Sequence, residues 1–173
     1  MTTESKFSPL LFAAIAVIVL PFGLYLMGLS LNTGTMVVAL ALAAMGLNLC
    51  IGYTGLVSFG HGAWFGIGAY AAGLIQRNWF GGDIFLPLLL ASVAVAVIST
   101  LVGIVILRRR GVYFSLLTLA LSALAYTIAF RWTAVTGGED GLGGLKRGSI
   151  GPFDLDDALN YYIVVSVLCL GVL

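Results

Sequence analysis

Charged side chains are scarce in this chain of 173 residues: they make up 9% of the sequence, whereas 61% of the residues are hydrophobic. A soluble domain has about 25% charged and about 45–50% apolar residues. Water would not keep such a chain in solution, whereas lipid tolerates apolar surface on all sides of a helix. The scarcity of charge therefore excludes an ordinary soluble domain and predicts an integral membrane protein.

Acidic residues are missing from every apolar run that is long enough to cross a bilayer. Transporters driven by protons or Na⁺ commonly bury such groups at membrane depth. The chain also lacks the G-x-x-x-x-G-K-[ST] loop that cradles nucleotide phosphates. We therefore expect no ion coupling and no cofactor in this chain, and any ATP that powers transport must be bound by partner subunits or another domain.

Residues that could hold a metal ion or perform catalysis are equally few. The two cysteines, Cys50 and Cys169, lie far apart inside apolar runs, which indicates packing rather than a redox pair. His61 is the only histidine, and one histidine is too few ligands for a metal site. A single histidine without an acidic residue nearby is also not enough for a catalytic site. The sequence predicts no metal site, no catalytic residue and no enzymatic activity.

Apolar runs dominate what is present. A spanning helix needs about 20 mostly apolar residues. The N-terminal apolar run is too long for the apolar region of a signal peptide, so we expect a retained first spanning helix. We expect an all-α, polytopic membrane helix bundle with about five to six spanning helices and one broken or short helix near residues 52–76. The expected helices cover residues 7–31, 35–51, 63–76, 85–107 and 112–130 and a run from Tyr161 onward.

Glycine interrupts this pattern between residues 52 and 62, where helical geometry is expected to break at Gly52, Gly55, Gly60 and Gly62. Non-helical backbone at membrane depth survives only where protein or a water-filled cavity satisfies it, and broken helices of transporters place such backbone beside the substrate. The break therefore favours a solute path, although a structural kink remains open. His61 either bonds carbonyls freed by the break or lies beside a polar path.

Charge in the connections predicts the topology. The cluster Arg108–Arg110 places its loop in the cytoplasm by the positive-inside rule. The N-terminus, with Lys6, is then cytoplasmic if residues 63–76 cross the membrane, and external if residues 35–75 form one re-entrant excursion. The loop 131–160, with three basic and five acidic residues, is expected outside. Its glycine-rich part, residues 136–145, is either a docking surface for an external partner or an ordinary solvated loop. We expect one transmembrane domain over residues 1–173, and we expect this domain to be truncated.

Three segments resemble the permease subunits of branched-chain amino acid ABC transporters, in their M-type form. They read MGLNLCIGYTGLVSFGHGAWFGIGAYAAGL, RRRGVYFSLLTLALSALAY and TGGEDGLGGL. The resemblance implies a location in the cell inner membrane, a second homologous permease subunit, two cytoplasmic ATPase subunits and an external substrate-binding protein. Such permeases are about twice as long, which implies that this chain corresponds to the N-terminal half.

The resemblance predicts a translocation subunit of an ATP-driven importer for branched-chain or similar small neutral amino acids. A permease for urea or short amides and an ATP-independent membrane channel or scaffold remain alternatives. The glycines at the break are expected to shape a gate. Five polar residues are expected to line the path and to hydrogen-bond a zwitterion: Asn48, Tyr53, Thr54, Ser58 and His61.

Overall fold

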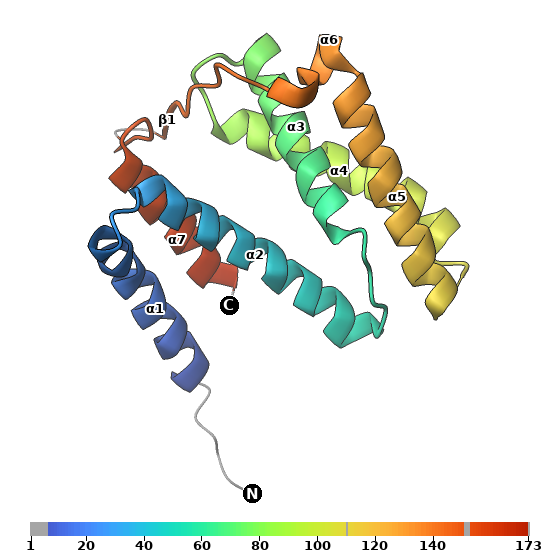
Figure 1. The fold of residues 1–173 in the computed structure, drawn as a ribbon, viewed down its shortest axis with the longest axis horizontal. Helices are drawn as coiled ribbons and strands as arrows, with labels where there is room; N and C mark the ends of the chain where they lie inside the picture. The colour runs from blue at the N-terminus through green and yellow to red at the C-terminus, as the bar shows by residue number, and fades with distance from the viewer. Residues whose placement is uncertain (1–6, 110, 151–152, 173) are drawn as a thin grey trace, which may run out of the picture. The chain divides into compact units, whose positions relative to one another are not determined.

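The computed structural model describes residues 7–109, 111–150 and 153–172, and these residues are mainly helical. Lys6 and Arg110, which entered the predicted topology, lie outside the described residues. Contacts divide the chain into two units, one of Met1–Gly46 with Asp154–Leu173 and one of Leu47–Phe153. The helices, coloured along the chain in Figure 1, are α1 Phe7–Leu26, α2 Leu31–Thr54, α3 His61–Trp79, α4 Phe85–Ile106, α5 Val112–Arg131, α6 Thr133–Thr136 and α7 Ala158–Val172.

The predicted all-α fold and its apolar helices are confirmed. Three helices, α2, α4 and α5, are long and apolar enough to cross a membrane, and the apolar parts of α1 and α7 are shorter. α3 has 19 residues and does not belong to this set. Short elements fill the connection between α5 and α7: the 3₁₀ helix η1 Gly138–Asp140 and two paired strands, β1 Ser149–Ile150 and β2 Phe153–Asp154.

Two predicted helix boundaries are wrong in an informative way. The first helix ends at Leu26, before a turn in which Gly28 adopts a positive φ of 72°. The second helix runs through Gly52 to Thr54, so the predicted break at Gly52 does not occur. A helical glycine costs about 1 kcal/mol relative to alanine. Unpaired backbone in hydrocarbon costs several kcal/mol, so the helix continues past this glycine.

In the first unit, a buried tyrosine of α7 repairs a defect in α1. Pro21 lies inside α1 and has no N–H, so it cannot donate to the carbonyl of Val17 four residues earlier. The Tyr162 hydroxyl donates a hydrogen bond of 2.6 Å to that carbonyl oxygen. Tyr162, Val38 and Cys169 form the buried core of this unit. Cys169 is thus a packing residue as predicted, whereas Cys50 is exposed.

In the second unit, α3 packs against both α4 and α5. In the C-terminal part of α3, the buried Gln76 side chain binds two connecting segments. Its Nε2 donates to the carbonyl oxygens of Lys146 at 2.6 Å and Asp83 at 3.3 Å. Gly73, also buried on α3, leaves room for the side chains of Leu142 and Leu145. The glycine-rich part of the predicted external loop is therefore held against α3.

Replacing Tyr162 with Phe should lower the free energy of unfolding by about 1 kcal/mol, because the Val17 carbonyl loses its donor. The loss should shrink in a Pro21→Ala background, where residue 21 regains an N–H. Reversible unfolding in mixed micelles measures all four corners of this double-mutant cycle. Tyr25→Phe, at an exposed position of α1, is the control. Equal losses in both backgrounds would contradict the repair of the proline defect.

Candidate functional site

The interruption between α2 and α3 covers residues 55–60, which is narrower than the predicted 52–62. Two of the predicted gate glycines lie in the non-helical segment, Gly55 and Gly60, whereas Gly52 and Gly62 are helical. Gly55 has a φ of 66° and donates its N–H to the Ile51 carbonyl at 2.9 Å, which ends α2 with the left-handed residue common at helix C-termini.

Short polar side chains satisfy part of the interrupted backbone locally. The Thr54 hydroxyl donates to the Cys50 carbonyl at 2.6 Å and accepts a hydrogen bond from the Leu56 N–H at 3.3 Å. The Ser58 hydroxyl accepts from the Gly60 N–H at 3.2 Å. Thr54 and Ser58 therefore have structural roles at the two ends of the break, whatever else they contact.

Three hydroxyl groups of α5 satisfy further backbone groups of the break across the helix interface. Ser115 donates to the Val57 carbonyl at 2.7 Å, and Ser122 donates to the Phe59 carbonyl at 3.3 Å. Between them, Thr118 accepts a bond of 3.1 Å from the Phe59 N–H. The non-helical backbone is thus bound to protein, which is one of the two conditions for its survival at bilayer depth.

The helical repeat brings these three hydroxyl groups together. Residues three or four apart lie on one face of a helix, and Ser115, Thr118 and Ser122 follow that spacing. The Thr118 hydroxyl is oriented by its own hydrogen bond of 2.8 Å to the Ser115 carbonyl, which leaves its lone pairs for the Phe59 N–H. We refer to Ser115, Thr118 and Ser122 as the α5 hydroxyl row. Sequence reasoning missed this row, although its spacing in an otherwise apolar helix was visible.

Gly60 permits the close approach of the break to α5. It is buried, and a Cβ at this position would lie 2.8 Å from the Thr118 carbonyl oxygen. At Gly62, two residues later, a Cβ would meet no atom within 4 Å. The glycine at position 60 is therefore required for packing, and the one at position 62 is not.

The predicted path residues are only partly brought together. Ser58 and His61 flank Gly60, and Thr54 ends α2. Asn48 and Tyr53 are exposed on the last turns of α2, with 87% of the Tyr53 surface accessible. None of these five residues is among those that line the large groove described next. Their roles in a solute path stay predictions.

A groove of about 980 Å³ runs between α3 and α5 and continues to α6 and η1. On α3 it is lined by small residues, among them Gly62, Ala63, Gly66 and Ala71. The lining is mainly apolar, and its polar groups are few. Tyr70, Ser122 and Tyr126 carry hydroxyl groups on the helices, and Trp132, Thr136 and Glu139 lie beyond the end of α5. The groove starts beside the break, because Ser122 belongs both to its lining and to the α5 hydroxyl row.

The end of the groove is held by the connection that follows α5. The buried Thr136 hydroxyl lies 2.5 Å from the Ala129 carbonyl oxygen and 2.8 Å from that of Trp132. It also accepts from the Gly138 N–H at 3.3 Å. These bonds place Glu139, which is exposed, at the rim of the groove. Within the described ranges, no group of three or more His, Cys, Asp or Glu side chains is placed to hold a metal ion.

The model of the family described as "Branched-chain amino acid transport system / permease component" matches residues 29–173. This chain belongs to that permease family. Two curated relatives carry the name high-affinity branched-chain amino acid transport system permease protein LivM. The chain is 30% identical to the protein from Salmonella typhimurium and 27% identical to the one from Escherichia coli, in each case over 118 residues.

The match to these permeases covers 68% of this chain and 28% of each relative. The matched region thus represents less than a third of the curated proteins' length. No solved structure matches the chain. Family membership is therefore established from sequence, and the arrangement of the break and the groove comes from the structure of this chain.

Replacing Thr118 with Val should lower the free energy of unfolding by about 1–3 kcal/mol, because the Phe59 N–H loses its acceptor at a partly buried site. Thr127→Val is the matched control, since the Thr127 hydroxyl bonds within its own helix, to the Ala123 carbonyl. Hydrogen exchange should accelerate at the Phe59 amide in the first variant only. Equal effects of the two substitutions would contradict the role of the α5 hydroxyl row.

Replacing Gly60 with Ala should destabilise the fold by about 1–3 kcal/mol, because the new methyl group overlaps the backbone of α5. Gly62→Ala should be neutral or stabilising by a few tenths of a kcal/mol, because its Cβ enters open space in a helix. Thermal unfolding of the two purified variants gives the comparison. A Gly62→Ala variant as unstable as Gly60→Ala would show that general helix effects, not the close approach, decide the outcome.

Proposed function

We propose that this chain forms part of the translocation subunit of an ATP-driven importer for branched-chain or similar small neutral amino acids. Membership of the permease family supports the transport role, and the observation that carries the proposal is the groove between α3 and α5. Ligand sites are commonly clefts of about 300–1,000 Å³, mostly apolar with a few polar groups. The groove has this size and this character.

The lining fits an aliphatic amino acid in two respects. Side chains such as Ile67, Leu74 and Leu121 offer apolar contact to a branched hydrocarbon side chain. The Glu139 carboxylate at the rim can pair with an α-ammonium group, and the Tyr70 hydroxyl can donate to a carboxylate. An amide such as urea has no hydrocarbon part that would benefit from the apolar lining, so the groove favours the amino acid over this alternative.

The break supplies a place where motion of α5 can alter the path. Its backbone is bonded to the α5 hydroxyl row, so a shift of α5 relative to α3 pulls on residues 57–59. In this proposal the segment acts as a gate beside the groove. The predicted path residues Asn48, Tyr53, Thr54, Ser58 and His61 serve that gate in the complete protein.

The complete transporter has further parts in this proposal. A second homologous permease subunit pairs with this chain. Two ATPase subunits bind the ATP and act on the cytoplasmic side, as the resemblance to ABC permeases implies. An external binding protein delivers the amino acid. The protein lies in the cell inner membrane. Its N-terminus is cytoplasmic if α3 crosses the bilayer, because the arginine cluster places the α4–α5 connection in the cytoplasm.

Filling the groove tests the proposal. Replacing Ala71 with Phe should reduce ATP-dependent leucine uptake by about fivefold or more, because a bulky side chain in the groove costs about 1–3 kcal/mol of substrate binding. Ala69→Phe introduces the same side chain at an exposed position of α3 that does not line the groove, and it should leave uptake unchanged. Proteoliposomes that contain the complete transporter, with and without ATP, provide the assay.

Equal uptake by the two variants would remove the groove from the path. Leucine uptake without ATP would favour the channel, and ATP-dependent uptake of urea in place of leucine would favour the amide permease. These results would contradict, in turn, the role of the groove, the dependence on ATP and the choice of substrate.

A further inference from the structure

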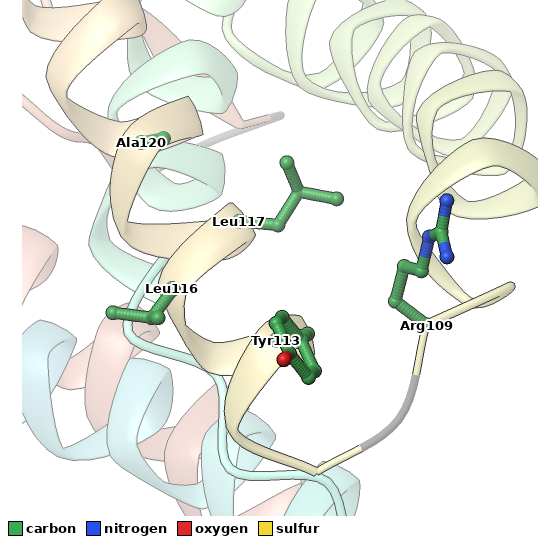
Figure 2. Close-up of a pocket in the computed structure, with 5 residues that line it drawn as sticks. All are labelled: Arg109, Tyr113, Leu116, Leu117 and Ala120. Atoms are coloured by element: carbon green, nitrogen blue, oxygen red, sulfur yellow. The ribbon is translucent and has the colours of Figure 1, made fainter.

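A second pocket lies at the opposite end of α5 from Glu139, beside the turn that joins α4 and α5. It has a volume of about 500 Å³ and is lined by Arg109, Tyr113, Leu116, Leu117 and Ala120. Figure 2 shows Arg109 on the turn, with its side chain across a gap from Tyr113 and Leu117 on α5. The pocket therefore joins one cationic group to an apolar strip along a helix.

The charge of this turn has no counter-charge in the surrounding sequence. Arg108, Arg109 and Arg110 are consecutive, and no Asp or Glu occurs in residues 84–138. Arg108 and Arg109 are exposed. A guanidinium group donates in a fork that matches phosphate oxygens. The turn thus presents positive charge that an external anion can neutralise.

The lining next to Arg109 favours a lipid over a soluble anion. Leu116 and Leu117 are 56% and 38% exposed, on a helix that is long and apolar enough to cross a membrane. Tyr113, 75% exposed, lies between them and the turn, and tyrosine is enriched at the level of the lipid headgroups. From the turn along α5, the pocket offers a positive charge, then a tyrosine and then an apolar surface. A phospholipid presents its parts in the matching order, with the phosphate at the bilayer surface and the acyl chain below it.

We propose that this pocket binds one anionic phospholipid. The lipid phosphate pairs with the Arg109 guanidinium, and the neighbouring Arg108 adds positive charge. The Tyr113 hydroxyl donates to the headgroup, and one acyl chain lies along Leu116, Leu117 and Ala120. The site is separate from the groove and from the proposed transport function, and it fixes the α4–α5 turn at the membrane surface.

The test measures lipid selectivity with the full chain purified in detergent. Native mass spectrometry counts bound lipids during titration with dioleoyl phosphatidylglycerol or dioleoyl phosphatidylcholine. Phosphatidylglycerol should bind several-fold more tightly. Arg109→Gln should weaken its binding about fivefold, because each arginine near a membrane surface contributes on the order of 1 kcal/mol with anionic lipid. Binding of phosphatidylcholine should weaken less, because its choline group cancels the charge of its phosphate. Arg131→Gln, at the other end of α5, is the matched control and should change nothing.

The apolar part of the site has its own variant. Ala120→Trp fills the pocket and should weaken both lipids, whereas inorganic phosphate at the same concentration should not compete. Equal affinity of the native chain for the two lipids overturns the proposal. So does an equal loss in Arg109→Gln and Arg131→Gln, which would reflect net charge alone. Full competition by inorganic phosphate, or unchanged binding to Ala120→Trp, would show that no acyl chain occupies the pocket.

Discussion

The need to pair every backbone N–H and C=O group away from water governs this structure from one end to the other. Where the sequence removes a donor, as at Pro21, the Tyr162 hydroxyl of another helix supplies one. Glycine weakens a helix, but at Gly52 the helix continues and keeps its backbone hydrogen bonds. Where the chain does leave helical geometry, at residues 55–60, hydroxyl groups on either side accept or donate.

The same constraint explains how much of the fold the sequence predicted. Apolar runs mark helices reliably in lipid, because a long apolar segment has no other way to satisfy its backbone. Helix ends were harder to place. Composition placed the second helix end at Ile51, whereas the end at Thr54 depends on the hydroxyl bond to Cys50 and the positive φ of Gly55. α7 begins before Tyr161, because the Asp157 side chain accepts from the Leu159 N–H.

The candidate site was predicted less well, for a reason that concerns long-range contacts. The sequence indicated the break from glycine and nearby polar residues, but the groups that hold it are about 60 positions later, on α5. Asn48 and Tyr53 are polar and close to the break in sequence, but the structure leaves them exposed at the end of α2. Polarity within one segment could not indicate which segment faces it. A test for hydroxyl spacing on the other predicted helices would have found the α5 hydroxyl row.

The position of that row changes what the break can do. Backbone bound by protein hydroxyl groups does not need water beside it, so the break by itself no longer requires a solute path. Ser122 instead links the break to the groove. Its hydroxyl donates to the Phe59 carbonyl, and the residue also lines the groove. One helix, α5, therefore carries both features. In the proposed transport role, a displacement of α5 changes the groove and the break together, because Ser122 belongs to both.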